Sequence, residues 1–103
     1  MTNAFLDTSA LFKLYHTEAY SEELSSYLAS SDIAAIVISE FAFVEYSSIV
    51  WRLVSEKAVD EIKASLLLQA FENDRDKYFV IEFESGDIEK TKRLLNAANL
   101  NNQ

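Results

Sequence analysis

The sequence contains no cysteine and no proline, and its single glycine is Gly86. Without cysteine, the chain has no disulfides, no thiolate ligands for zinc and no thiol nucleophile, a composition typical of a reducing compartment. The near absence of glycine and proline argues against long linkers and disordered repeats. Long apolar runs are also missing, since no stretch approaches the roughly 20 apolar residues of a membrane-spanning helix. We therefore expect a cytoplasmic protein that does not enter a membrane.

Basic residues are scarce as well. The 103 residues include 9 lysines and arginines against 17 aspartates and glutamates, which gives a formal net charge of −8. This is the wrong sign for a protein that holds nucleic acid by its surface charge, because the phosphate backbone is itself negative. Any contact with nucleic acid would need a bound metal ion or a local basic strip. Half of the residues are hydrophobic, so we expect residues 1–103 to form a single domain around one core.

The spacing of apolar residues predicts alternating strands and helices. Short apolar or β-branched runs are typical of strands, and apolar residues three or four positions apart are typical of helices. In order, the expected elements are a strand at 4–6, a helix capped by Thr8 or Ser9, a helix beginning near 21, a strand at 33–38, a helix at 40–55 capped by Ser39, a helix at 58–74, a strand at 78–83 and a last helix from 87 onward. This βααβααβα order predicts an α/β fold with parallel strands and right-handed crossovers.

Asp7 is the acidic residue best placed for chemistry. It follows the first expected strand, and in parallel α/β sheets ligands bind outside the carboxyl ends of the strands. An aspartate at a strand-to-helix turn can also simply cap the helix. The position of Asp7 alone therefore leaves both interpretations open.

Glu45 is the second candidate, because it lies in the middle of the helix expected at 40–55. Glu40 has a ready explanation, since the helix dipole favours an anion in the first turn. Glu45 has no such explanation, and a buried carboxylate without a partner is costly. Two interpretations stay open: Glu45 pairs with Arg52 or lies at a solvated margin, or it converges with Asp7 on a divalent cation.

Two stretches of the chain resemble a known family. The first is Phe5-Leu6-Asp7-Thr8-Ser9-Ala10-Leu11-Phe12-Lys13-Leu14-Tyr15, and the second leads from Ile38-Ser39 to Val44-Glu45-Tyr46. In order and separation they resemble the two N-terminal motifs of VapC-like PIN domains, the ribonuclease toxins of type II toxin and antitoxin pairs.

The resemblance implies a Rossmann-like PIN domain, with three α/β/α layers around a short parallel sheet, and a metal-dependent endoribonuclease activity. Asp7 and Glu45 match the first two acidic positions of the family. There, carboxylates hold Mg²⁺ or Mn²⁺, and the ion activates a water for in-line attack on an RNA phosphodiester. Ser9 matches a small polar position beside the first acid. The implied partners are an RNA substrate and a cognate antitoxin.

The sequence departs from the family at its C-terminal end. PIN enzymes carry further acids in strings that resemble Leu-Asp-Ala and Thr-x-Asp, and this chain reaches Gln103 before either string. We expect a partial PIN domain whose C-terminal strands are missing, so that the strand at 4–6 keeps an unpaired, apolar edge. Such an edge predicts a homodimer, a higher oligomer or a truncated gene product.

Two functions follow from these observations. One is an endoribonuclease with an incomplete acidic site, and the alternative is a non-catalytic, truncated PIN domain that acts as an antitoxin-binding or dimerising module. A receiver-type signalling domain fits poorly, because it needs paired acids after its first strand and Asp7 stands alone. The only histidine, His16, is expected at the surface or in a capping role, since a lone histidine is seldom a ligand or catalyst.

Overall fold

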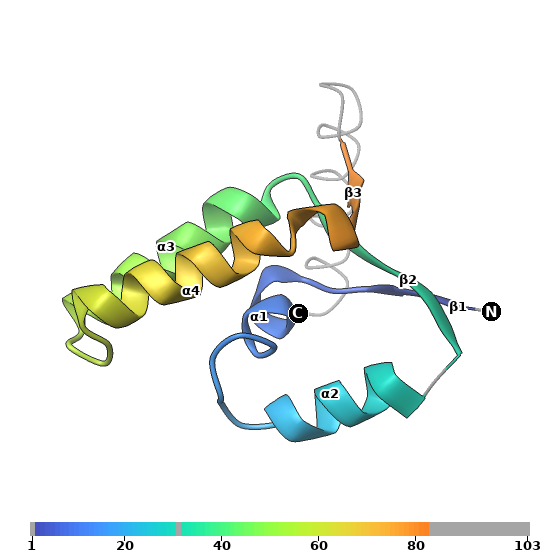
Figure 1. Ribbon diagram of the computed structural model, residues 1–103, viewed down its shortest axis with the longest axis horizontal. Helices are drawn as coiled ribbons and strands as arrows, with labels where there is room; N and C mark the ends of the chain where they lie inside the picture. Colours follow the sequence, from blue (N-terminus) through green and yellow to red (C-terminus); the bar gives the residue numbers. More distant parts are fainter. Residues whose placement is uncertain (1, 31, 83–103) are drawn as a thin grey trace, which may run out of the picture.

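The computed structural model describes residues 2–30 and 32–82 (Figure 1). The strands are β1 (Thr2–Phe5), β2 (Ile33–Ser39) and β3 (Phe79–Ile81). The helices are α1 (Thr8–Phe12), α2 (Ser21–Ser30), α3 (Ala42–Ser55) and α4 (Glu61–Asn73), and a short 3-10 turn covers Arg75–Lys77. The order of these elements agrees with the expected pattern. The last expected helix, from 87 onward, lies outside the described residues.

The three strands form one parallel sheet in the order β1-β2-β3 (Figure 1). Phe5 of β1 aligns with Val37 of β2, and Val37 aligns with Phe79 of β3. The register shifts once, between Thr2 and Asn3. The central strand is a run of isoleucine, valine and alanine that ends at Ser39, and such apolar runs are typical of strands in parallel sheets. The expected small α/β fold with a parallel sheet is therefore confirmed.

The hydrophobic core lies between one face of the sheet and the helices. Its buried members come from β2, from α1, α3 and α4, and from the residue that follows β1: Leu6, Leu11, Phe12, Ile38, Ala42, Tyr46, Val50, Ala64, Leu67 and Phe71. Full burial of a large apolar side chain stabilises a fold by about 1.5–3 kcal/mol. The one hydroxyl in this set, that of Tyr46, donates a 2.6 Å hydrogen bond to the Leu67 carbonyl oxygen, so its burial leaves no polar group unsatisfied.

A second polar contact ties the turn that follows α1 to the residues that precede β3. The Tyr15 hydroxyl donates to Asp74 Oδ2 over 2.8 Å and also shares a hydrogen bond with the Tyr78 hydroxyl. Burial, and then the contacts with Tyr78 and Asp74, raise the pKa of Tyr15 far above its usual value. Burial also raises the pKa of Tyr78, so both tyrosines stay neutral hydrogen-bonding groups within the fold across the ordinary pH range.

Helix α3 begins two residues later than the sequence predicted. The backbone N–H of Glu40 donates to the Ile81 carbonyl oxygen over 2.9 Å. Glu40 therefore still pairs with β3 at the carboxyl end of the sheet and does not yet belong to the helix. The Ser39 hydroxyl accepts from the Phe41 N–H at 3.1 Å, which supports the turn before the helix instead of capping it. The predictions that Ser39 is the N-cap and that Glu40 lies in the first turn are therefore wrong.

Helix α4 also begins later than expected, at Glu61 instead of residue 58. Asp60 is its N-cap, with Oδ1 accepting a 2.7 Å hydrogen bond from the Lys63 N–H, and aspartate is among the best residues for this role. Lys57 has a φ of 61°, a left-handed conformation that ends α3 and turns the chain into the α3–α4 hairpin. Among the helices of the described residues, none combines the length and apolar character that a membrane span requires.

Candidate functional site

Asp7 lies just beyond the carboxyl end of β1. The chain leaves the strand through Leu6, which is buried and whose N–H still donates to the Val37 carbonyl oxygen at 3.0 Å. Asp7 is then the N-cap of α1, and its Oδ1 accepts a 2.8 Å hydrogen bond from the Ala10 N–H. The capping interpretation is therefore confirmed, and the prediction that Thr8 or Ser9 caps the helix is wrong, because both lie within its first turn.

Capping uses only part of the hydrogen-bonding capacity of the Asp7 carboxylate. The side chain is exposed, and an ionised carboxylate has two oxygens with about four lone-pair sites. One of these sites is used by the Ala10 N–H. Among the described residues, the hydrogen bond to Ala10 is the one that the Asp7 side chain is seen to make. Asp7 can therefore cap the helix and still offer an oxygen to a second donor or to a cation.

Glu45 is exposed and lies in the first turn of α3. The prediction of a mid-helix carboxylate is wrong, because the later start of α3 moves Glu45 close to the N-terminus of the helix. In that position the helix dipole stabilises its negative charge. Arg52 does not pair with it, since the Arg52 Nε lies 3.9 Å from Glu56 Oε1. Of the two simple explanations for Glu45, the solvated margin is the one that the structure supports.

Thr8 brings the two candidate carboxylates to the same end of the sheet. Its Oγ1 donates a 2.9 Å hydrogen bond to Glu45 Oε1. Because Thr8 directly follows Asp7, this bond joins the turn that holds Asp7 to the first turn of α3. Sequence reasoning missed Thr8 and selected its neighbour Ser9, which is exposed. Within the described part of the chain, no hydrogen bond joins Ser9 to Asp7 or Glu45.

Carboxylate oxygens, such as those of Asp7 and Glu45, are the type of donor that a hydrated divalent cation prefers. Mg²⁺ commonly keeps several waters and binds through only one or two carboxylates, which Asp7 and Glu45 can supply. A closed set of ligands is not formed within residues 2–30 and 32–82, because no three His, Cys, Asp or Glu side chains gather there at metal-binding distances. His16 is elsewhere: its ring stacks on Phe12 with centroids 5.4 Å apart, and its Nδ1 lies 3.7 Å from Glu18 Oε1.

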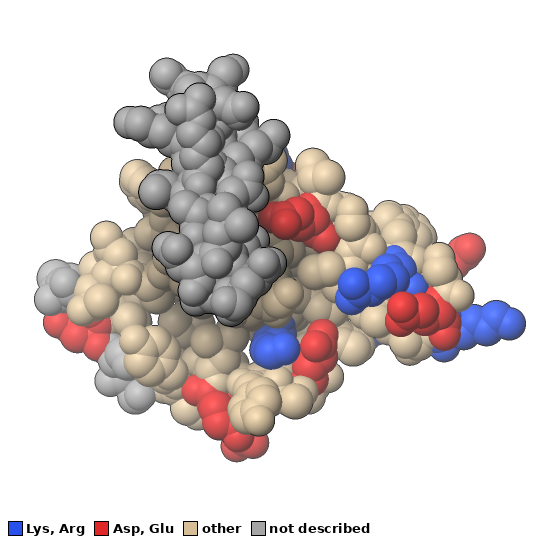
Figure 2. All heavy atoms as spheres, turned by 180° about the vertical axis from the view of Figure 1, so that it is seen from behind, with Lys and Arg blue, Asp and Glu red and all other residues tan. Residues whose placement is uncertain are grey.

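The charge around these carboxylates is negative. Between Leu14 and Trp51 the sequence has no lysine and no arginine, and it has the acids Glu18, Glu22, Glu23, Asp32, Glu40 and Glu45. Figure 2 shows acidic side chains over α2 at the lower edge, whereas most basic side chains on that face lie over the α3–α4 hairpin at the right. Such a distribution attracts cations and repels the phosphates of RNA.

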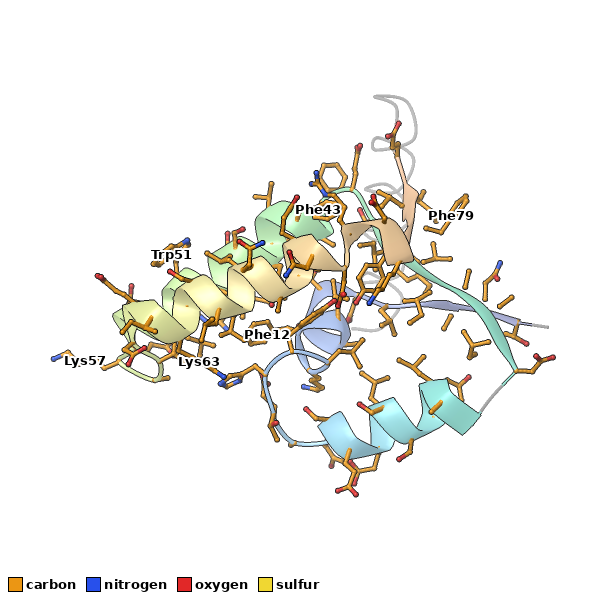
Figure 3. All side chains as sticks on the ribbon, viewed as in Figure 1. Phe12, Phe43, Trp51, Lys57, Lys63 and Phe79 are labelled. Carbon is orange, nitrogen blue, oxygen red and sulfur yellow. The ribbon has the colours of Figure 1, made fainter. Side chains whose placement is uncertain are left out.

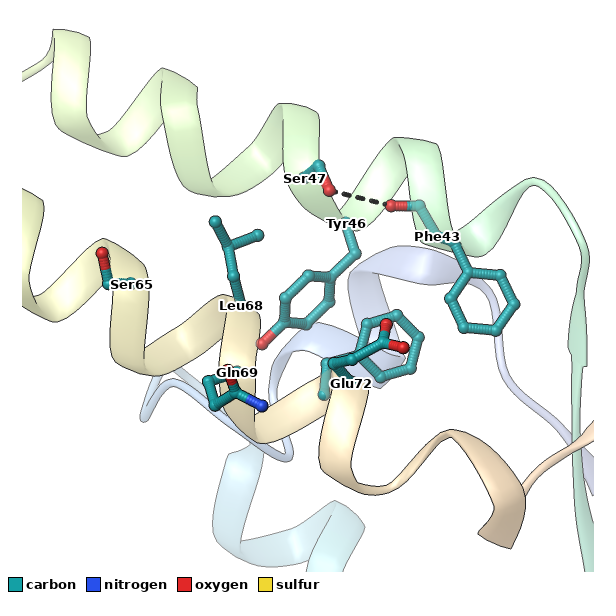
Figure 4. A pocket seen from close by; sticks show the side chains of 8 residues that line it. Phe43, Tyr46, Ser47, Ser65, Leu68, Gln69 and Glu72 are labelled. Atoms are coloured by element: carbon teal, nitrogen blue, oxygen red, sulfur yellow. Dashed lines mark hydrogen bonds between the residues drawn. The ribbon is translucent and has the colours of Figure 1, made fainter.

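A separate groove lies between α3 and α4. It encloses about 480 Å³ and is lined by Phe43, Tyr46, Ser47, Ser65, Leu68, Gln69, Phe71 and Glu72 (Figure 4). The Ser47 hydroxyl donates to the Phe43 carbonyl oxygen at 3.1 Å, within its own helix. Neither Asp7 nor Glu45 lines this groove, and both residues are exposed. Comparison with known protein families and with curated proteins finds no match for this chain.

Proposed function

We propose that this chain is a PIN-type, metal-dependent endoribonuclease of the cytoplasm, with Asp7 and Glu45 as ligands of Mg²⁺ or Mn²⁺. The observation that carries the proposal is the Thr8 to Glu45 hydrogen bond. It holds the two carboxylates selected by the PIN-like motifs at one end of a parallel sheet, the end where such sheets bind ligands. Local spacing in the sequence does not bring them together, because 37 positions separate Thr8 from Glu45.

The contribution of the chain to this reaction is positioning. The cap bond to Ala10 orients the Asp7 carboxylate, and the Thr8 hydroxyl orients that of Glu45. Ligands that are oriented before the substrate arrives lose less entropy during the reaction. A bound cation would lower the pKa of a water molecule that it coordinates and would neutralise part of the phosphate charge. In the hydrolysis itself a water oxygen bonds to phosphorus and gives up a proton, the P–O ester bond breaks, and the leaving oxygen takes up a proton.

Calorimetric titration with Mn²⁺, together with cleavage of a mixed RNA pool, tests this proposal. Asp7→Asn and Glu45→Gln should each weaken Mn²⁺ binding by about tenfold or more, because each removes a unit charge close to the ion. RNA cleavage should be lost in parallel. Glu22→Gln is the matched control, since Glu22 is also an exposed glutamate in the first turn of a helix. Equal Mn²⁺ affinity in all three variants would rule out this site.

The second candidate function is a non-catalytic module that binds an antitoxin or a second copy of the chain. The observation in its favour is that the α3–α4 hairpin exposes four apolar side chains, Val44, Trp51, Ile62 and Leu66, the kind of side chain from which contiguous protein-binding patches are built. A chain that leaves RNA intact and binds no Mn²⁺, but forms a stable complex that Trp51→Glu disrupts, would favour this function over the nuclease.

A further inference from the structure

Arg52 lies on the same side of α3 as Glu45. Ser48 stands between them, and residues at positions i, i+3 and i+7 follow one row along a helix. All three residues are exposed. At about 1.5 Å per residue, Arg52 lies about 10 Å further along the helix axis than Glu45. A positive charge therefore follows the proposed metal ligand along one surface of α3.

The guanidinium of Arg52 is available to a ligand. Arg52 is the one basic residue of α3. Among the described residues its ion-pair partner is Glu56, whose Oε1 lies 3.9 Å from the Arg52 Nε, and the two side chains are 64% and 59% exposed. An exposed pair at that separation contributes little. A planar guanidinium forms paired hydrogen bonds with phosphate oxygens, so Arg52 can exchange Glu56 for a phosphate.

Trp51 adds an aromatic surface to the same stretch of α3. It is 48% exposed and, within the described residues, belongs neither to the core nor to the side chains packed against it. Figure 3 shows it on the side of α3 that faces away from Phe12. Unpaired bases stack on exposed aromatic rings of this kind, and every base has a face that can do so.

A low strip of helix surface separates Trp51 from Arg52. Successive residues of a helix point about 100° apart, and the small, exposed residues Ser48 and Ser55 lie between the two larger side chains. The Ser48 hydroxyl donates to the Val44 carbonyl oxygen at 3.1 Å, within its own helix. A chain that lies on this strip would have a cation on one side and an aromatic ring on the other.

We propose that a single-stranded segment of RNA lies along this side of α3, with a phosphate on Arg52 and an unpaired base stacked on Trp51. The inference rests on the proposed nuclease function, because the metal at Glu45 sets one end of the path. A stacked strand advances about 3.4 Å per nucleotide, so Arg52 lies about three nucleotides from the metal. A duplex fits this path poorly, since its paired bases are not open to an aromatic side chain.

The path agrees with the distribution of charge. Acidic side chains over α2 repel phosphates, and α3 runs from the end of the sheet away from α2 (Figure 1). On the face shown in Figure 2, most basic side chains lie over the α3–α4 hairpin. A strand that leaves the metal along α3 therefore moves away from the acidic side chains over α2.

Fluorescence anisotropy of a labelled oligouridine RNA tests the role of Arg52. The titration is made at low salt in EDTA, so that neither bound metal nor cleavage contributes. Arg52→Gln should weaken binding about fivefold, because a charged hydrogen bond is lost. The slope of log affinity against log salt should become shallower by about 0.7, the value for one phosphate contact of a single strand. Arg52→Lys should keep the slope. Lys63→Gln, which removes an exposed cation from α4, should change neither quantity.

Trp51 is the single tryptophan of the chain, so its own fluorescence reports the proposed stacking in the unmodified protein. Saturating RNA should quench it. Trp51→Ala should weaken RNA binding about fivefold or more and leave the salt slope unchanged, because a stacked base is lost without a phosphate contact. Ile62→Ala is the matched control, since it removes another exposed apolar side chain of the hairpin and should not affect binding.

Several results would overturn the inference. These are no binding of the RNA by the wild-type chain, unquenched Trp51 fluorescence at saturation, or wild-type affinity in both Arg52→Gln and Trp51→Ala. A Trp51→Ala chain that binds the RNA normally but no longer associates with itself would assign this side of α3 to a second copy. Mn²⁺ titration of Asp7→Asn and Glu45→Gln judges the metal site separately, so the RNA path can fail while that site stands, and the reverse.

Discussion

Thr8 and Glu45 are separated by 37 positions, and the hydroxyl of the first donates a 2.9 Å hydrogen bond to the carboxylate of the second. The bond joins the first turn of α1 to the first turn of α3, across the carboxyl end of the sheet. It gives Glu45 a defined orientation although the side chain is exposed. Thr8 is thus a positioning residue for the proposed metal site.

Thr8→Val should weaken Mn²⁺ binding by roughly threefold to tenfold. The substitution keeps the shape of the side chain but removes the donor, and one hydrogen bond contributes about 0.5–1.5 kcal/mol. Thr8→Ser keeps the hydroxyl and should restore most of the affinity. Calorimetric titration of the two variants measures the effect. Wild-type affinity in Thr8→Val would show that the orientation of Glu45 does not matter for the ion.

Substitutions of Asp7 should separate its two roles. Asparagine caps helices about as well as aspartate, whereas alanine costs about 0.5–2 kcal/mol. Asp7→Asn should therefore keep the free energy of unfolding and lose Mn²⁺ affinity, while Asp7→Ala should lose both. Urea denaturation and metal titration of the same two proteins provide the comparison. Full Mn²⁺ affinity in Asp7→Asn would leave Asp7 with its capping role alone.

Much of the fold could be predicted from local patterns. The run at 33–38 is predicted to be a strand because a continuous stretch of isoleucine, valine and alanine is typical of strands in parallel sheets, and the structure extends it only to Ser39. The boundaries of α3 could not be predicted in the same way. They depend on the bond from the Glu40 N–H to the Ile81 carbonyl oxygen, which exists only after β3 has joined the sheet.

The candidate site shows the same limit. The motif around Asp7 and the acid at Glu45 were visible in the sequence, but the contact made by Thr8 was not. Whether Thr8 or Ser9 faces α3 depends on where α1 begins, and the cap at Asp7 decides that position. The contact between Thr8 and Glu45 therefore depends on where α1 and α3 begin, and helix ends are the features that local sequence patterns locate least well.

We expect the free energy of unfolding to fall at acid pH because the Asp74 carboxylate becomes protonated. The contact with Lys77, and then the hydrogen bond from Tyr15, lower the pKa of the Asp74 carboxyl below its usual value. A lowered pKa in the folded state means that the unfolded chain binds the proton more tightly. The contribution of Asp74 is thus complete above about pH 4, near the ordinary aspartate pKa, and is lost as the pH falls through the lowered value.

Urea denaturation between pH 2.5 and 7 measures this dependence. Asp74→Asn should flatten the acid limb of the stability profile. Asp76→Asn serves as the control, because Asp76 is exposed and only two positions away. An unchanged acid limb in Asp74→Asn would place the source of acid sensitivity in other carboxylates.

The free edge of β1 should promote self-association. Within the described residues β1 pairs only with β2, and the N–H groups of Thr2 and Leu6 point toward that strand. By alternation, the N–H groups of Asn3 and Phe5 point to the open side, where another strand can pair with them. We therefore expect the purified chain to form dimers or larger species, as light scattering after size-exclusion chromatography would show.

Asn3→Pro should shift this assembly toward monomer. Proline removes the outward N–H of Asn3 and is tolerated on an edge strand, and among the described residues no ladder bond of β1 with β2 is lost. Asn3→Ala keeps the N–H and should leave the assembly unchanged. If both variants associate as the wild type does, the contact between copies lies elsewhere, and Trp51→Glu on the α3–α4 hairpin is then the substitution expected to release the monomer.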